Sequence, residues 1–162
     1  APPTPRQAAH TLRPSPHQPP LPQDTDHATD EAGHSNGPII HRDTPNFMIQ
    51  AGGFLPDMTE KATGEPVVNE SKNKVHNTRG TLAMARTSDP DSATAQFFIN
   101  QRNNLQLDWA PNQPGYTVFG EVINGMRVVD FIATAPTGKV DRFSDVPVEP
   151  IIIKEIVRAK LL

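Results

Sequence analysis

The chain has 162 residues, a formal net charge of −3 and no cysteine, which fits one domain and excludes disulfides and thiolate chemistry. No apolar run reaches the roughly 18 residues of a membrane span, and residues 1–20 hold no apolar signal-peptide core. No basic cluster suggests nucleic-acid binding, so we expect neither membrane nor nucleic acid as a partner.

Residues 1–37 form an anomalous segment that is rich in proline and histidine. Their large aliphatic side chains are Leu12 and Leu21 alone, too few to offset the entropy of ordering the chain. Proline also disfavours helix interiors and central strands. We therefore predict a polar arm, irregular or disordered, over 1–37. Its four histidines match no compact ligand spacing, so no metal site is expected; binding of a metal by this arm is kept as an alternative.

From residue 39 on, short apolar runs alternate with clusters of Gly, Pro, Asn and Asp, a pattern typical of strands and turns. The predicted strands are 47–49, 81–85, 96–99, 116–119 and 148–157. One helix is predicted after Gly125, where apolar side chains recur near a 3.6-residue period until Pro136. Many short strands with one helix predict a mainly β protein, either a barrel or a sandwich.

The sequence holds no motif for covalent or acid–base catalysis: no G-x-S-x-G, no P-loop and no H-E-x-x-H. Instead, one cation, Arg42, is followed in the sequence by amide side chains and large apolar side chains. If these residues converge, they form an apolar pocket with one strong donor at its rim. Otherwise the apolar ones are simply core. Because strand residues alternate between faces, only one of Phe97 and Phe98 can line such a pocket.

Residues 40–54 resemble the F-H-R-x-x-P-x-F-M-x-Q-G-G-x-F signature of cyclophilins. Residues 77–87 and 92–100 are similar to the bacterial branch of that family, and 116–122 and 125–130 follow in the family's order. The resemblance implies a single domain over 1–162, with 38–162 as the clear match. It also implies an eight-stranded antiparallel β-barrel capped by helices. Residues 136–150 look more like the periplasmic bacterial type than the cytoplasmic one, so we expect the periplasm, with the cytoplasm as the alternative.

The resemblance implies a peptidyl-prolyl cis/trans isomerase that assists folding, acts on proline-containing peptides and unfolded proteins, needs no cofactor and is a monomer. Rotation about an X–Pro bond faces a barrier of ~18–20 kcal/mol, and only the twisted amide has to be stabilised. Arg42 would donate to the proline nitrogen, which becomes basic as resonance is lost. A gain of about 5 kcal/mol gives an acceleration of several thousandfold. The alternative is a proline-peptide-binding module with little or no turnover.

The resemblance also assigns individual residues. Arg42 and Gln50 would be catalytic, with Gln50 orienting Arg42 and meeting the substrate carbonyl. The residues implied to bind substrate are His41, Phe47, Met48, Ala85, Arg86, Gln96, Phe98, Leu107 and Tyr116. Of these, the proline-ring pocket would consist of Phe47, Met48, Phe98 and Leu107. For His41 the alternative to substrate binding is a structural role, because the reaction transfers no proton.

Three departures from the family pattern have consequences. Gln106 stands where relatives usually have an aromatic residue, which predicts weak cyclosporin binding; Trp109 lies three residues later. Asp43 and Thr44 replace an apolar pair. Residues 1–37 occupy the place of two apolar strands and a helix without supplying their residues. Three accounts stay open: an error in the reported sequence such as a shifted reading frame, true divergence with poor strands, or a disordered arm beside an incomplete barrel.

Overall fold

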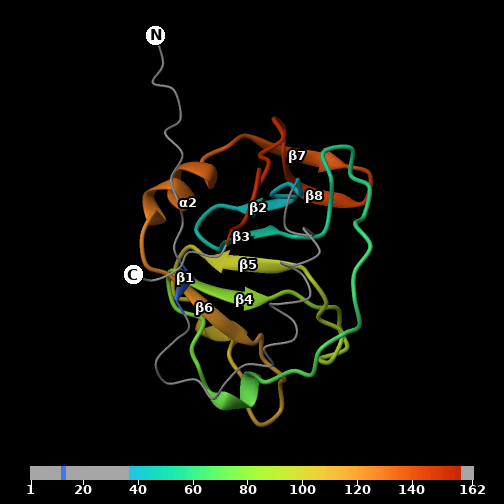
Figure 1. The fold of residues 1–162 in the computed structure, drawn as a ribbon. Helices are drawn as coiled ribbons and strands as arrows, with labels where there is room; N and C mark the ends of the chain where they lie inside the picture. The colour runs from blue at the N-terminus through green and yellow to red at the C-terminus, as the bar shows by residue number, and fades with distance from the viewer. Residues whose placement is uncertain (1–11, 14–36, 158–162) are drawn as a thin grey trace.

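The computed structural model describes residues 12–13 and 37–157, and the labels below are those of Figure 1. The described residues form eight strands: β1 (Leu12–Arg13), β2 (Arg42–Thr44), β3 (Met48–Ala51), β4 (Thr81–Met84), β5 (Phe97–Asn100), β6 (Val118–Val122), β7 (Thr137–Val140) and β8 (Phe143–Pro147). They also form the helix α2 (Met126–Ile132) and the 3-10 helices η1 (Ser71–Asn73) and η2 (Leu105–Leu107). No helix in this part of the chain is long and apolar enough to span a membrane.

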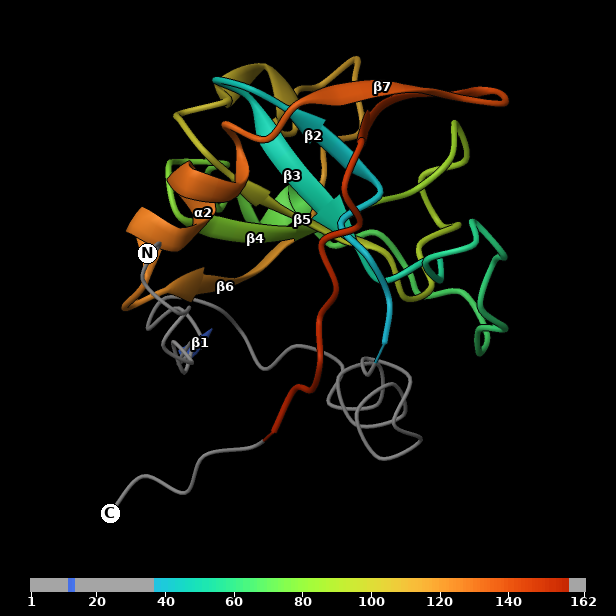
Figure 2. The ribbon, with the colours of Figure 1, turned by 90° about the horizontal axis from the view of Figure 1, so that it is seen from above.

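The strands form two antiparallel sheets, which confirms the prediction of a mainly β fold. The larger sheet has the order β1-β6-β4-β5-β3-β2, and β7 pairs with β8 in a separate hairpin. The hairpin packs beside β2, where the Thr44 hydroxyl donates to an Asp145 carboxylate oxygen at 3.3 Å. Viewed from above, α2 and the hairpin lie at different ends of the larger sheet (Figure 2).

Register in the larger sheet sorts its side chains onto two faces, because directly opposed residues of antiparallel strands share a face. The row on what we call the outer face runs through Arg42, Gln50, Phe98 and Ala83. The next row, on what we call the inner face, runs through Asp43, Ile49, Ile99 and Leu82. Successive residues of β2 therefore face opposite sides, and Arg42 is exposed between the buried His41 and Asp43.

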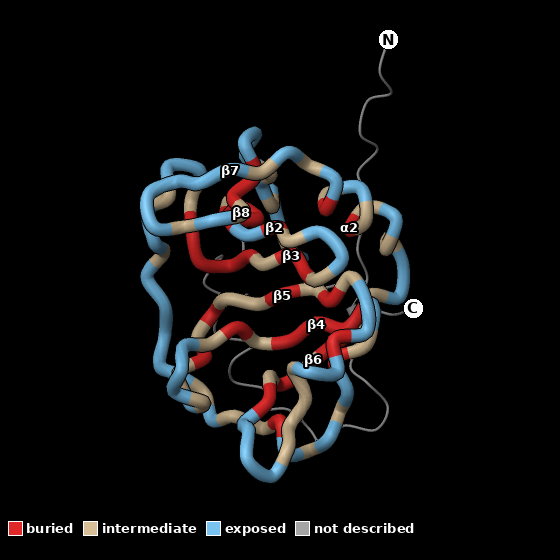
Figure 3. Tube along the Cα trace, turned by 180° about the vertical axis from the view of Figure 1, so that it is seen from behind, coloured by how far each residue is buried: buried red, intermediate tan, exposed pale blue. Residues whose placement is uncertain are grey.

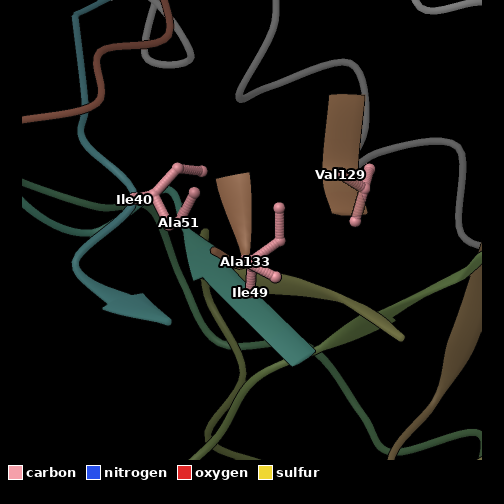
Figure 4. Packing of buried hydrophobic residues seen from close by; sticks show 5 residues of the cluster. All are labelled: Ile40, Ile49, Ala51, Val129 and Ala133. Carbon is pink, nitrogen blue, oxygen red and sulfur yellow. The ribbon is translucent and has the colours of Figure 1, made fainter. Parts of the chain in front are cut away.

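Each face has its own apolar cluster. The inner cluster consists of Ile40, Ile49, Ala51, Val129 and Ala133, drawn in Figure 4, with α2 covering it. The outer cluster consists of Met48, Ala83, Ala85, Phe98 and Val118. Burial along the central strands is visible in Figure 3, where β4 is largely buried. Fully burying one large apolar side chain contributes roughly 1.5–3 kcal/mol, so both clusters stabilise the sheet.

Helix α2 forms as the sequence predicts. Gly125 caps its start with a φ of 98°, a conformation that glycine adopts without strain. Val129 is buried in the inner cluster, and Met126 and Ile132 pack against it, so one stripe of the helix faces the sheet. Pro136 follows the helix end within a few residues. The 3.6-residue pattern thus predicted both the helix and its buried side.

The strand predicted over 148–157 is wrong. Residues 150–153 run beside 37–40 and exchange backbone hydrogen bonds such as Ile40 N to Ile151 O at 2.9 Å, but the pairing gives only the isolated bridge Ile39–Ile152. Pro38 has no N–H, so a regular ladder cannot continue past it. Ile151 and Ile153 still pack onto the inner cluster, whereas Ile152 is 49% exposed. The apolar run is therefore used at alternate positions of an irregular segment.

Other elements were not predicted. Strand β2 reads as polar on both faces, and β7 is exposed along most of its length, so neither shows apolar alternation. In the arm, Leu12 and Arg13 pair with Val122 and Glu121 of β6, where no strand was expected. The rest of 1–36 lies outside the described residues, and with it the predicted irregular arm and its histidines.

Candidate active site on the outer face of the sheet

Arg42 stands at the rim of the outer face. It lies on β2, at one end of the strand order, and register places it opposite Gln50 of β3. Its guanidinium has no hydrogen-bond or carboxylate partner among residues 37–157. A guanidinium stays protonated and carries five donors in a rigid fork. The site therefore presents a fixed charge whose donors are available to an incoming group.

The outer cluster lies on the same face as Arg42, where the sequence predicts the proline-ring pocket. Met48 and Phe98 are buried, while Phe47, Leu107 and Tyr116 pack against them and stay partly exposed. The rings of Phe98 and Tyr116 meet edge to face, with centroids 5.6 Å apart, an arrangement that aromatic pairs favour. All of these were predicted to bind substrate, and the structure brings them together on the face that carries Arg42. Val75 packs there too, which the sequence did not indicate.

The tertiary structure decides which of the two adjacent phenylalanines faces the pocket. Phe98 belongs to the outer cluster, and Phe97 packs against the inner one. The expectation that only one of them faces the pocket is confirmed.

Two amide side chains, Gln50 and Gln96, join the row. Gln50 Nε2 donates to Gln96 Oε1 at 2.9 Å, and no described bond links Gln50 to Arg42. Gln96 lies against Gly53, where an added Cβ would come within 2.5 Å of its amide and would force the Gln96 side chain to shift. The backbone N–H of Ala85 donates to the Gln96 carbonyl at 2.9 Å. The amides are thus held in place, with Gln50 directed toward Gln96.

His41 directly precedes β2 and is buried, unlike the neighbouring exposed Arg42. It is 4% exposed, and its ring meets Phe54 edge to face at 4.7 Å. Burial lowers the pKa of His41 to about 4; the Arg42 charge adds to this, and hydrogen bonds to Gln96 and the Ile39 backbone oppose it. His41 is therefore neutral at pH 7. This placement favours the structural alternative over substrate contact.

A buried chain of three asparagines supports the pocket walls. Asn77, Asn100 and Asn104 are all fully buried. Asn100 Nδ2 donates to Asn77 Oδ1 at 3.1 Å, and Asn104 Nδ2 donates to Asn100 Oδ1 at 2.8 Å. The same Asn104 group donates to the Phe47 carbonyl at 2.8 Å. Buried amides are stable only when they are paired, so this chain fixes the backbone around the pocket.

The sequence did not single out these asparagines. Residues 100–104 follow an apolar run and have the composition of a turn, so the burial of Asn100 and Asn104 was not expected. The available signal was the large number of Asn and Gln residues around the apolar blocks, but composition alone does not distinguish a turn amide from a buried one. Their partners lie up to 57 residues away in the chain, so only the tertiary structure reveals them.

Comparison with known proteins now identifies the family. Residues 26–158 match the family described as "Cyclophilin type peptidyl-prolyl cis-trans isomerase/CLD". The chain belongs to the cyclophilin family.

Among curated cyclophilins, the chain is 57% identical over 116 residues to the peptidyl-prolyl cis-trans isomerase of Acinetobacter baylyi, covering 72% of this chain and 62% of that one. It is 50% identical over 123 residues to peptidyl-prolyl cis-trans isomerase A of Dickeya dadantii, covering 76% and 65%. For isomerase B of Escherichia coli the identity is 51% over 127 residues, covering 76% and 77%. The matches thus span less than two thirds of the first two relatives.

A solved structure shows the same fold. The cyclophilin-type isomerase of Cryptosporidium parvum, crystallised in the presence of the dipeptide Ala-Pro, superposes with a TM-score of 0.70 at 27% identity, and 85% of each chain is covered.

Gln106 takes the position where the resemblance to the family predicts an aromatic residue. Gln106 is exposed on η2 next to Leu107 and reaches Asn104 Oδ1 at 3.4 Å. The Trp109 ring lies below the Lys74 ammonium, 6.0 Å from its centroid, and is not among the residues packed on the outer cluster. Beside Leu107 the chain therefore presents an exposed polar side chain and no aromatic ring from Trp109.

Asp43 is the other departure from the cyclophilin pattern. It is fully buried on the inner face, and neither carboxylate oxygen has a hydrogen-bond partner in the described part of the chain. Burial and, to a smaller extent, the nearby Asp145 charge together raise the pKa of Asp43 to about 6. A buried carboxylate without hydrogen-bond partners costs free energy that an apolar residue at this position would not, so Asp43 destabilises the strand that carries Arg42. Among residues 37–157, no group of three or more potential ligands could hold a metal ion.

Proposed function

We propose that this chain is a peptidyl-prolyl cis/trans isomerase acting on proline-containing peptides and unfolded proteins. The observation that carries the proposal is the placement of Arg42, exposed and without a described partner, on the same sheet face as the apolar pocket floored by Met48 and Phe98. Family membership and relatives named as isomerases support it.

The arrangement matches what rotation about X–Pro requires. A proline ring is apolar and flat enough to pack on Phe98, with Phe47 and Leu107 at its edges. The amide then stands near Arg42. As the bond twists, resonance is lost and the lone pair of the nitrogen becomes an acceptor, so a guanidinium N–H binds the transition state more tightly than the ground state. No bond is broken, and no proton has to be transferred.

A coupled isomerisation assay with a short proline peptide tests this. We expect measurable turnover by the wild type and a loss of about a hundredfold to a thousandfold in kcat/KM for Arg42→Ala, the usual effect of removing one preorganised donor. Arg42→Lys should recover part of the loss. Arg127→Ala, at an exposed arginine on α2, is the matched control and should change nothing.

The second candidate is a module that binds proline peptides without useful turnover. The hydrogen bond of Gln50 to Gln96 rather than to Arg42 favours it. The isomerisation assay distinguishes the two candidates. If the chain is only a binding module, wild type and Arg42→Ala both show turnover no higher than the uncatalysed background, while both still bind peptide. That result would end the enzyme proposal.

We further propose weak cyclosporin binding, which the exposed Gln106 in place of an aromatic residue supports. Gln106→Trp should tighten the binding of cyclosporin measured by calorimetry. A nanomolar dissociation constant for the wild type would refute the proposal.

We propose the periplasm as the compartment, because residues 136–150 resemble the periplasmic bacterial type. Fractionation of bacteria that express the full-length gene product tests this, and recovery with cytoplasmic markers would contradict it.

A further inference from the structure

Arg86 is a second cation beside the pocket, and the mechanism above does not use its charge. It follows β4, and its guanidinium stacks on the Tyr116 ring, 4.4 Å from the centroid. The other neighbour of Tyr116 is Phe98, at 5.6 Å between ring centroids. A single aromatic ring therefore separates the Arg86 charge from the pocket floor.

The guanidinium of Arg86 is held rigidly. Nη2 donates to the Pro114 carbonyl at 2.8 Å, and Nη1 donates to the Thr87 carbonyl at 2.9 Å. Nε and Nη2 both reach the Gly115 carbonyl at 3.3 Å. A side chain fixed in this way has already lost its rotamer freedom, so it binds a ligand without a further entropic penalty.

All of these acceptors are neutral, so the charge of Arg86 is not compensated. No carboxylate within the described residues forms an ion pair with it. The acidic residues of the neighbouring loop accept backbone hydrogen bonds instead: Asp91 accepts from the Asn69 N–H at 2.8 Å, and Asp89 accepts from the Asp91 N–H at 2.9 Å. Arg86 thus provides a fixed positive potential at one edge of the pocket.

We propose that Arg86 is a specificity-determining residue that favours peptides with Asp or Glu two residues from the proline. An extended peptide advances about 3.3 Å per residue, so a side chain at this separation reaches past Tyr116 to the guanidinium when the proline ring lies on Phe98. The proposal rests on the proposed function for the position of the proline. It adds the charge of the neighbouring substrate residue.

Matched peptides test the proposal. They carry Glu, Gln or Lys at one position, either two residues before or two residues after the proline, and are otherwise identical. Both kcat/KM and the dissociation constant are measured, the latter through the fluorescence of Trp109, the single tryptophan of the chain. For one of the two positions we expect the Glu peptide to be preferred over the Lys peptide about threefold to fivefold, the range of a partly exposed ion pair.

Variants and salt separate charge from structure. Arg86→Gln should bring the Glu-to-Lys ratio close to one, and Arg86→Lys should keep part of the preference. In the wild type, which needs no substitution, the ratio should fall as sodium chloride is raised. A wild-type ratio near one, or a decrease for all three peptides by the same factor in Arg86→Gln, would mean that Arg86 only clamps the 114–116 loop, and would overturn the proposal.

The same measurements tell the two proposals apart. If no peptide is isomerised but the Glu peptide binds more tightly, the enzyme proposal fails and the charge preference stands. If the Gln peptide is isomerised and all peptides respond equally, the enzyme proposal stands and the charge preference is lost. Absence of binding by every peptide contradicts both.

Discussion

The two faces of the larger sheet are built from neighbouring residues of the same strands, yet they differ in which charged groups lack a partner. On the outer face the apolar cluster is open at its edge, and Arg42 and Arg86 carry charges without carboxylate partners in the described chain. On the inner face α2 and residues 151–153 close the cluster, and the buried carboxylate of Asp43 has no hydrogen-bond partner in the described chain. An exposed unpaired cation is available for binding, whereas a buried unpaired anion lowers stability.

Substitution of the adjacent phenylalanines gives the largest expected effect and tests the division into faces. Phe98→Ala should lower the free energy of unfolding by about 3–5 kcal/mol, as expected for a buried aromatic residue, and it should also lower peptide affinity. Because such a variant could unfold, Phe97→Leu and Phe98→Leu are the informative pair, each with a loss of about 1 kcal/mol in urea unfolding. Only Phe98→Leu should weaken the binding of a proline peptide. An equal loss of affinity in Phe97→Leu would refute the assignment of faces.

The asparagine chain sharpens the comparison, because it lies on the outer face and yet is wholly buried. Asn100→Ala removes the donor to the buried Asn77 Oδ1 and one acceptor of Asn104 Nδ2, so we expect a loss of about 2–3 kcal/mol in unfolding free energy. It should also raise the KM of a proline peptide, since Asn104 holds the Phe47 carbonyl. Asn112→Ala, at an exposed asparagine, is the control. If Asn100→Ala melts and binds like the wild type, the chain does not support the pocket.

The inner face gives a smaller effect of opposite sign. Since the pKa of Asp43 is raised from 3.8 to about 6 on folding, the folded state binds the proton more tightly, and stability from this group falls as pH rises from about 4 to about 6. Asp43→Asn should therefore raise the free energy of unfolding at pH 7 by on the order of 1 to 2 kcal/mol. Urea unfolding at pH 4.5 and 7.5 measures it.

His41 opposes Asp43 over nearly the same pH range. Its pKa is lowered from 6.5 to about 4 on folding, so its contribution to stability is lost as pH falls toward 4. The two slopes largely cancel in the wild type. In Asp43→Asn the His41 slope remains alone, so this variant should lose stability on acidification more steeply than the wild type. If Asp43→Asn and wild type have parallel pH profiles, Asp43 is not buried as a strained carboxylate.

Much of the fold followed from local patterns. Strands β3, β4 and β5 lie close to where short apolar runs between turn residues placed them, and helix α2 lies where apolar periodicity placed it, because it buries one stripe. Strand β6 begins at Val118, two residues later than predicted, since Tyr116 packs against the pocket before the ladder starts. Strand β2 and the β7–β8 hairpin were missed, because β2 is polar, β7 is mostly exposed and β8 buries only its last two residues, so none of them shows a regular apolar pattern.

The sequence by itself determined the family, through ordered blocks such as 40–54 and 92–100, and it determined that Phe97 and Phe98 face opposite ways, because strand alternation is a local property. Only the tertiary structure decided which of the two faces the pocket. It also decided that His41 and Asp43 are buried, that asparagines taken for turn residues hold the pocket walls, and that Arg86 keeps an uncompensated charge beside Tyr116. Burial, hydrogen-bond satisfaction and charge compensation all depend on residues far away in the chain, and no local pattern encodes them.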